Sequence, residues 1–183
     1  MIRVFDVIFS LLGLLVLGPL ILSLWIFGKI DTGSPIFRQV RMGKEKNPFQ
    51  LFKFRSMNTN TQGVPTHLVE VGAITKWGSV LRKSKLDEIP QLLNVLIGDM
   101  SLVGPRPNLY NQVELIEERA KRDVYAVRPG ITGLAQISKI DMSTPQLLAE
   151  TDAKMIKHLN LGHYFKYIFL TVLGKGFGDR VSK

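Results

Sequence analysis

The longest uncharged stretch of the chain limits what the protein can fold into. Residues Val7–Gly28 carry no charged side chain, and they are bounded by Asp6 and Lys29. As an α-helix this run would be about 33 Å long, which is enough to cross the hydrocarbon core of a bilayer. The run is too long for a signal peptide, and no A-x-A-like cleavage site follows it. It therefore predicts a membrane segment.

A Gly18–Pro19 pair near the middle of this run interrupts a continuous helix. Proline there removes one backbone hydrogen bond and clashes with the carbonyl of Leu15, at a cost of roughly 3 kcal/mol in a helix interior. Two structures satisfy the sequence: a kinked spanning helix, and a re-entrant hairpin with limbs Val7–Gly18 and Pro19–Gly28. The excess of Lys and Arg after the run favours a cytoplasmic location for the residues that follow it.

Composition narrows the classes of partner and of chemistry. The chain has 183 residues, enough for one domain with a core, and its 24 Lys and Arg against 15 Asp and Glu give a net charge of +9. Such a charge favours an anionic partner: lipid head groups, phosphorylated substrates or nucleic acid. The absence of cysteine excludes disulfides and thiolate chemistry. The three histidines lack metal-site spacing, and neither a Walker phosphate loop nor a Gly-x-Ser-x-Gly elbow is present.

The segment Leu86–Pro107, LDEIPQLLNVLIGDMSLVGPRP, is the most distinctive part of the sequence. We expect Asp87 to be an N-cap, with Glu88 as the first helical residue and apolar residues recurring with helical spacing up to Leu96. Gly98 fits the end of that helix. The two acids would then lie at the positive end of a helix dipole, which favours their ionised forms. They serve either as capping residues only or as a functional pair.

The remaining patterns predict an α+β fold that is mostly α. A β-hairpin is expected over Ile36–Met57, with a polar turn around Gly43–Asn47 and with Lys53 and Arg55 on one face. The other expected elements are, in chain order, a loop over Asn58–Thr75, a helix from Pro107 to about Lys121, a loop over Tyr125–Ile137, a helix from Ser143 toward Leu159, and an apolar segment Leu161–Leu173 that lies on a membrane surface or packs on the core.

Two of these helices carry more specific expectations. The helix from Pro107 would turn one set of apolar residues toward the core: Leu109, Val113, Ile116 and Ala120. The later helix opens with Ser143-Thr144-Pro145-Gln146, which predicts a capping box with proline in the first turn. It also carries Asp152.

Four separated arginines accompany the acid pair: Arg55, Arg82, Arg106 and Arg128. Arg106 and Arg128 each precede a proline, which biases them to extended conformations, and an arginine fixed in this way suits bidentate binding of a phosphate. Acids beside phosphate-binding cations suggest Mg²⁺ coordination or nucleophilic attack on phosphorus. Each arginine alone is more often a surface charge, so the interpretation depends on the set.

Four segments share one order and spacing with a known family: FRQVRMGK, FQLFKFRSM, LRKSKLDEIPQLLNVLIGDMSLVGPRP and RPGITGLAQI. In these segments, and over essentially its whole length, the chain resembles the bacterial sugar transferases, the monotopic phosphoglycosyl transferases that begin lipid-linked glycan assembly. The resemblance implies transfer of a sugar 1-phosphate from a UDP-sugar to undecaprenyl phosphate, with release of UMP. It also implies a requirement for Mg²⁺ and no nucleic acid partner.

The same resemblance assigns roles to residues. By the family motif, Asp87 is the nucleophile that forms a phosphosugar–aspartyl intermediate, and Glu88 helps to bind Mg²⁺ or activates the incoming lipid phosphate. Asp87 and Glu88 would be the metal ligands. The residues that align with substrate-binding and phosphate-binding positions of the family are Lys53, Arg55, Arg82, Arg106, Arg128 and Asp152.

The resemblance also bears on the membrane. The family usually forms a re-entrant helix broken at a Ser-Pro pair, and Gly18 replaces that serine here. It implies a re-entrant helix over residues 1–30, and a catalytic domain with interfacial amphipathic helices over residues 31–183, at the cytoplasmic face of the inner (plasma) membrane. The absence of a further N-terminal membrane region resembles the small members, which often use UDP-linked N-acetylated deoxyamino sugars such as diacetylbacillosamine.

Two other functions remain open from the residues. The first is a membrane-anchored module that binds polyanions through its basic face without catalysis, which would need no particular acid. The second is a transferase of unrelated polytopic type, and the presence of one apolar run of spanning length argues against it.

Overall fold

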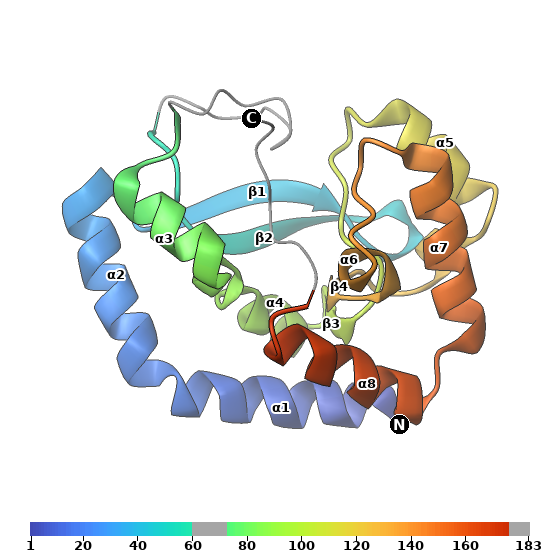
Figure 1. The fold of residues 1–183 in the computed structure, drawn as a ribbon, viewed down its shortest axis with the longest axis horizontal. Helices are drawn as coiled ribbons and strands as arrows, with labels where there is room; N and C mark the ends of the chain where they lie inside the picture. The colour runs from blue at the N-terminus through green and yellow to red at the C-terminus, as the bar shows by residue number, and fades with distance from the viewer. Residues whose placement is uncertain (60–72, 176–183) are drawn as a thin grey trace.

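The structure is a computed structural model of the full chain, and it describes residues 1–59 and 73–175. These residues form an α+β fold that is mostly helical, as Figure 1 shows. The elements in chain order, with 3₁₀ turns labelled η, are α1 (Ile2–Val16), α2 (Gly18–Thr32), β1 (Ile36–Met42), η1 (Lys44–Lys46), β2 (Pro48–Phe54), α3 (Lys76–Ser84), η4 (Leu86–Glu88), α4 (Gln91–Ile97), β3 (Ser101–Val103), α5 (Val113–Ala120), η5 (Val124–Ala126), β4 (Gly130–Thr132), α6 (Leu134–Ile137), α7 (Pro145–His158) and α8 (Leu161–Val172).

The apolar N-terminal run forms two helices. α1 and α2 meet at Leu17 and are bent by 64°, and no single helix of the described residues is long and apolar enough to cross a membrane. Pro19 lies in the first turn of α2, where its missing N–H has no intrahelical partner to lose. Backbone hydrogen bonds of the helical type continue up to the break on both sides. The Leu17 N–H donates to Gly13 O (2.9 Å), and the Ile21 N–H donates to Leu17 O (2.8 Å). The predicted break is confirmed, and each helix extends beyond the charge-free run.

Two charged residues attach α1 to the rest of the molecule. The Arg3 guanidinium donates from Nη1 to Val95 O (2.6 Å) and from Nη2 to Leu96 O (3.1 Å), which satisfies carbonyls at the end of α4. Asp6 is buried, and its Oδ1 accepts three hydrogen bonds of 2.9 Å, from Ser101 Oγ, the Leu102 N–H and Tyr164 OH. α1 is thus bonded to α4, β3 and α8, and Figure 1 shows α8 lying beside it.

The predicted β-hairpin is confirmed. β1 and β2 pair antiparallel over their full length, with Phe37 opposite Lys53, and η1 forms the turn. Lys53 and Arg55, which were predicted to share one face, are both buried. Most of the loop predicted over Asn58–Thr75 lies outside the described residues.

The acid pair does not cap the helix that follows it. α4 begins at Gln91 with Pro90 at the N-cap position, and the pair lies in the separate turn η4. The prediction of Asp87 as an N-cap was wrong because Lys85, at φ 58°, turns the chain into a short 3₁₀ segment before Pro90. The helix ends as predicted, at Gly98 with φ 108°.

The helix predicted from Pro107 begins at Val113 instead. The intervening residues bond to the hairpin: the carbonyl of Asn108 accepts the N–H of the last residue of β1 at 3.0 Å. The later start changes the face that is turned inward, so Leu115 and Arg119 are buried and Val113 is exposed. Of the predicted inner face, Leu109 is buried, Ile116 and Ala120 are partly buried, and Val113 is exposed, so the prediction was correct only in part.

A small parallel sheet lies where part of a loop was predicted. β3 pairs with β4, with Ser101 opposite Gly130. The two backbones approach so closely that a Cβ on Gly130 would overlap the backbone of Gly104. This contact fixes the segment after β3 that carries Arg106.

The last two helices were predicted at the correct places. α7 begins at Pro145, although the capping box does not form, because the Ser143 hydroxyl donates to the preceding turn. α8 has one face in the core, with Tyr164 and Tyr167 buried, and an opposite apolar face that leaves Phe169 exposed. The main core joins the hairpin, α4, β3, α7 and α8, and α5 and α7 lie at the edge of the molecule away from α2 (Figure 1).

Candidate active site

Two adjacent carboxylates, Asp87 and Glu88, lie in η4 between α3 and α4. Their exposed fractions are 4 % and 9 %. An ionised carboxylate is buried at a cost of several kcal/mol unless it is paired and hydrogen-bonded. The residue before the turn, Lys85, has a left-handed backbone with φ 58°, a conformation that is strained for a residue with a side chain. Buried charge and backbone strain in one turn are typical of functional sites.

Glu88 is held between two cations from different parts of the chain. Its Oε1 lies 3.4 Å from Lys53 Nζ and 2.8 Å from Arg106 Nη2. Lys53 comes from the end of β2, and Arg106 comes from the segment after β3. The two positive charges compensate the buried carboxylate. The geometry therefore brings three of the predicted site residues together, Lys53, Glu88 and Arg106, and Asp87 is the buried neighbour of Glu88 in the same turn.

Arg106 is positioned by a residue that the sequence did not reveal. Arg119 of α5 is almost completely buried, and its Nη1 donates to the backbone carbonyl of Arg106 at 2.8 Å and to Asn108 Oδ1 at 2.9 Å. No motif marks Arg119, and its burial follows only from the actual start of α5. Asp152 of α7 was the one signal in the sequence that could have indicated a buried cation nearby.

Asp152 is the acidic partner of Arg119. Its Oδ2 accepts from Arg119 Nη2 at 2.7 Å and from Arg119 Nε at 3.1 Å, and its side chain has no exposed surface. Burial raises the pKa of the Asp152 carboxyl, and the Arg119 guanidinium opposes that rise. Asp152 thus lies behind the cluster and contacts it through Arg119, which makes it a positioning residue.

Arg82 and Arg55 lie near the end of β2 with different partners. Arg82 of α3 donates from Nε to Ser56 Oγ at 2.8 Å, which joins the helix before the acid pair to the hairpin. Arg55 donates from Nε to Ser34 O at 2.9 Å, and its guanidinium lies over the ring of Phe37. Arg55 therefore faces the junction of α2 and β1.

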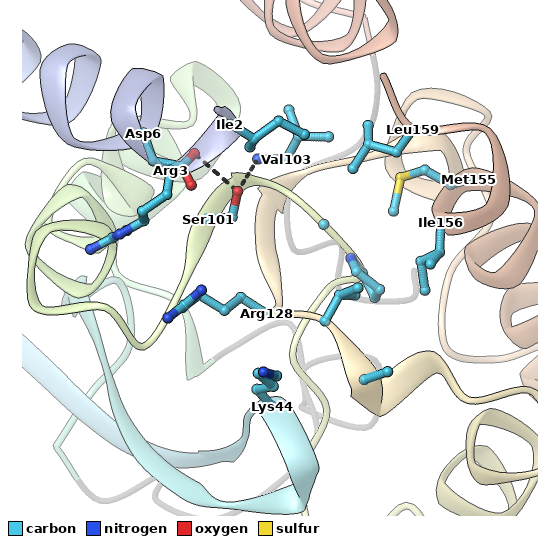
Figure 2. Close-up of a pocket in the computed structure, with 14 residues that line it drawn as sticks. Ile2, Arg3, Asp6, Lys44, Ser101, Val103, Arg128, Met155, Ile156 and Leu159 are labelled. Carbon is cyan, nitrogen blue, oxygen red and sulfur yellow. Dashed lines mark hydrogen bonds between the residues drawn. The ribbon is translucent and has the colours of Figure 1, made fainter. Parts of the chain in front are cut away.

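Arg128 lies apart from the acid pair. Its Nε donates to Gly98 O at 2.7 Å, at the end of α4. Glu88 precedes that helix, and the intervening residues span roughly 15 Å at helical rise. Figure 2 shows Arg128 and Lys44 on one side of a pocket of about 270 Å³, with Arg3 and Asp6 of α1 on the other. The structure does not bring Arg128 together with Glu88.

The described residues contain no ready-made metal cage. Within residues 1–59 and 73–175, no group of three or more His, Asp or Glu side chains could hold a metal ion. Mg²⁺ is commonly bound by one or two carboxylates together with the phosphates of a substrate. Asp87 and Glu88 fit that type of site, because they supply two carboxylates that are adjacent in one turn, and Glu88 lies against Lys53 and Arg106.

Residues 1–176 match the family model described as bacterial sugar transferase. The chain is 43 % identical over 148 residues to the exopolysaccharide production protein PSS of Rhizobium leguminosarum bv. phaseoli, covering 74 % of the chain and 72 % of that protein. It is 37 % identical over 171 residues to the uncharacterised sugar transferase EpsL of Bacillus subtilis strain 168, covering 93 % and 84 %.

A longer relative has a named activity. The chain is 36 % identical over 192 residues to the UDP-glucose:undecaprenyl-phosphate glucose-1-phosphate transferase of Escherichia coli strain K12, covering 98 % of the chain and 41 % of that protein. The chain thus spans most of the first two relatives and less than half of the third. The residues that match the family model include the acid pair and the cations around it.

Proposed function

We propose that this chain, which belongs to the bacterial sugar transferase family, is a membrane phosphoglycosyl transferase. It would move a sugar 1-phosphate from a UDP-sugar to undecaprenyl phosphate, release UMP, and so begin the assembly of a lipid-linked glycan. The observation that carries the proposal is the buried pair Asp87–Glu88 with Lys53 and Arg106 on Glu88. The name of the Escherichia coli relative supports the reaction class.

Asp87 is the proposed nucleophile. One of its carboxylate oxygens would attack the sugar-bearing phosphorus of the UDP-sugar, which forms an aspartyl–phosphate bond and breaks the bond to the leaving UMP. An oxygen of undecaprenyl phosphate would then attack the same phosphorus, release the Asp87 carboxylate and give the sugar diphospholipid. A carboxylate nucleophile thereby divides one displacement between two anions into two steps.

The cations reduce the repulsion in both steps. Lys53 and Arg106 already face a carboxylate oxygen of Glu88 at 3.4 Å and 2.8 Å, so they are positioned to bind phosphate oxygens beside it. Arg82 is proposed for the same role from the helix before the turn. Arg119 and Asp152 hold Arg106 in place from behind.

Mg²⁺ is the proposed cofactor, and Asp87 and Glu88 would hold it together with the donor phosphates. When bound, the ion supplies neutralisation of the diphosphate charge. The chain's own residues would orient the substrate. The carboxylates and cations come from three segments that are fixed against one another.

The protein is proposed to be monotopic and to act at the cytoplasmic face of the inner membrane. α1 and α2 would enter and leave the same leaflet, with the catalytic residues after α2 on the cytoplasmic side. Three features support this: the 64° bend, the exposed apolar side chains of both helices, and the anchoring of Arg3 and Asp6 on the same body as the active site.

The donor is proposed to be a UDP-linked N-acetylated deoxyamino sugar. The Escherichia coli relative is named for UDP-glucose. A donor panel should therefore include UDP-glucose, UDP-N-acetylgalactosamine and UDP-diacetylbacillosamine.

The deciding experiment measures UMP release from this panel by the detergent-solubilised chain with undecaprenyl phosphate. We expect release with one donor, loss of release in excess EDTA and recovery on addition of Mg²⁺. Asp87→Asn should abolish turnover while the protein stays folded, and wild-type protein given donor alone should show a sugar-phosphate adduct on Asp87 by mass spectrometry. Turnover by Asp87→Asn at near the wild-type rate would overturn the mechanism and favour a polyanion-binding module.

A further inference from the structure

Two distant segments of the chain meet at the contact between Lys53 and Glu88. Lys53 lies at the end of β2, and Glu88 lies in η4, 35 positions later in the chain. Their charged atoms are 3.4 Å apart, which is longer than the roughly 2.7–2.9 Å of a usual charge-assisted hydrogen bond. The separation is therefore determined by the way β2 is held against the segment that carries Glu88, rather than by the ion pair itself.

Asn94 of α4 connects these two segments. It is completely buried, with an exposed fraction of 0 %. Its Oδ1 accepts the N–H of Phe52 at 3.0 Å, and its Nδ2 donates to the carbonyl of Gln50 at 2.6 Å. One carboxamide thus bonds to two alternate residues of β2, as a peptide group of a neighbouring strand would, on the edge of β2 away from β1.

The same residue also closes the end of its own helix. The backbone carbonyl of Asn94 accepts the N–H groups of Gly98 at 3.2 Å, Asp99 at 3.0 Å and Met100 at 3.2 Å. Its Nδ2 also donates to Asp99 Oδ2 at 3.4 Å, so the amide oxygen and both amide hydrogens have partners. Asn94 is therefore fixed in α4, and its bonds to β2 hold the whole helix against that strand.

Each of the two cations on Glu88 thus has a buried residue that holds its backbone. Arg119 donates to the backbone carbonyl of Arg106. Lys53 directly follows the residue of β2 whose N–H is bonded to Asn94, and Glu88 lies shortly before α4 in the chain. The bonds between Asn94 and β2 therefore fix the backbone of Lys53 relative to that of Glu88.

We propose that Asn94 is a positioning residue that sets the separation between Lys53 and Glu88. At 3.4 Å the Lys53 ammonium faces the carboxylate without a short bond to it, so it can turn to a substrate phosphate. The proposal rests on the proposed function in assigning a phosphate to Lys53. The separation itself does not depend on that function.

The separation can be tested without any substrate. Thermal unfolding midpoints in detergent are measured for Lys53→Met, Glu88→Gln and the double variant, and the departure from additivity reports the interaction of the two side chains. We expect a departure of about 3 °C or more. In the Asn94→Leu background it should fall to about half or less, because the Phe52 N–H and the Gln50 carbonyl lose their partner and β2 moves toward water.

Two further variants support this measurement. Asn94→Ser keeps at most one of the two bonds to β2 and leaves room for water, so it should reduce the departure by a smaller amount if Asn94→Leu does not fold. The matched control is Val95→Ala, at a neighbouring position of α4 that is also completely buried. It removes core packing but no bond to β2, so it should lower all four midpoints and leave the departure the same within about 1 °C.

The rate of UMP release separates positioning from a general loss of stability. Asn94→Leu should lower kcat about fivefold or more when Lys53 is present. In the Lys53→Met background the same substitution should lower kcat less than about twofold, because the side chain through which Asn94 acts is already absent. A residue that only stabilises the fold would lower kcat by the same factor in both backgrounds.

Three results would overturn the proposal. The first is an unchanged departure from additivity in both Asn94→Leu and Asn94→Ser. The second is a change in Val95→Ala as large as that in Asn94→Leu. The third is an equal loss of kcat with and without Lys53. The unfolding measurements need no donor, so a lack of UMP release from every donor would refute the proposed transfer reaction, and the midpoints would still decide the role of Asn94.

Discussion

Glu88 and Asp152 carry buried negative charge in different ways. Glu88 shares one oxygen between Lys53 and Arg106, which belong to separate segments and face the proposed substrate. Asp152 is bound by Arg119 alone, and its second oxygen is buried without a hydrogen-bond partner among the described residues. Lys53 and Arg106 can therefore exchange the Glu88 carboxylate for a substrate phosphate, whereas the Arg119–Asp152 pair only holds its neighbours in place.

Asp152→Asn should destabilise the protein strongly. The substitution leaves the Arg119 charge buried without its counterion, and breaking a buried pair in this way costs about 3–5 kcal/mol. The thermal unfolding midpoint in detergent should fall by roughly 6 °C or more. Glu150→Gln on the same helix is the control, because its pair with Arg122 at 3.1 Å is largely exposed and such pairs contribute about 1 kcal/mol or less. Equal midpoints for the two variants would contradict the assignment.

Arg106→Ala and Arg128→Ala form a matched pair, since each arginine precedes a proline in a similar backbone setting. The sequence predicts a phosphate-binding role for both. The structure places only Arg106 against Glu88, so Arg106→Ala should lower kcat/KM for UMP release at least tenfold, which is about 1.4 kcal/mol of transition-state stabilisation. Arg128→Ala should have a smaller effect. A loss in Arg128→Ala as large as that in Arg106→Ala would show that Arg128 reaches the phosphates after all.

At the scale of elements, local sequence patterns predicted an element correctly where its own residues determine where it begins and ends. The hairpin, the end of α4 at Gly98, the starts of α7 and α8 and the break before Gly18 all follow from nearby turn and helix signals. The β3–β4 pair could not be predicted, because strands of three residues carry no periodicity and their pairing depends on close contact of Gly104 with Gly130. α5 was misplaced because Asn108 bonds to the hairpin, which is a distant contact.

The candidate site could also be predicted only in part from local patterns. The motif located Asp87, Glu88, Lys53 and Arg106, and the structure joins the last three by ion pairs and buries Asp87 beside Glu88 in η4. Arg119 was missed because its role depends on the register of α5. The sequence also could not show that Arg128 lies apart from Glu88. Arg106 and Arg128 both precede a proline, so they have the same local pattern, although Arg106 contacts Glu88 before α4 and Arg128 contacts Gly98 after it.

The break between α1 and α2 supports a topology test. We propose that the helices are re-entrant, so a cysteine at position 2 should be protected from a membrane-impermeant thiol reagent in intact cells. Pro19→Leu restores the missing N–H and should straighten the pair into a spanning helix, because 22 uncharged residues match the hydrocarbon thickness. Position 2 should then become labelled.

The anchors and a neighbouring glycine supply the controls for this test. Gly18→Ala keeps the proline, and a Cβ there meets no other atom within 4 Å, so labelling should remain absent. Adding Arg3→Ala to Pro19→Leu removes the bonds to α4 and should increase labelling further. Strong labelling at position 2 without any of these substitutions would show a spanning helix.

At the scale of the whole molecule, apolar side chains are exposed along three helices. α1, α2 and α8 leave large hydrophobic residues on the surface, among them Leu15, Ile26 and Phe169. Figure 1 shows α8 beside α1, and Phe165 contacts the rings of Phe5 and Phe9. A soluble protein rarely exposes apolar surface of this extent. These helices are therefore the proposed membrane side.

A pair of spin labels would test this orientation, and the absence of cysteine makes single labels straightforward. In lipid vesicles, a nitroxide at position 169 should be relaxed more by oxygen, which concentrates in lipid, than by a water-soluble nickel chelate. A nitroxide at position 121, on the exposed end of α5, should show the reverse. Preference for the nickel reagent at both positions would remove α8 from the membrane.

The hydrogen bonds of Asp6 join the start of the chain to residues that are synthesised much later. Its partners are separated from it by 95, 96 and 158 positions along the chain, so the carboxylate near the N-terminus is fully bonded only after α8 has been synthesised. Contacts of such long separation form late, because the loops that close them lose much conformational entropy. A ribosome-bound chain that ends before Tyr164 would hold α1 with an incompletely satisfied acid next to apolar surface. The bond from Tyr164 is thus the last of the three to become possible as the chain is synthesised, and it closes α8 onto a helix that α4 and β3 can already hold.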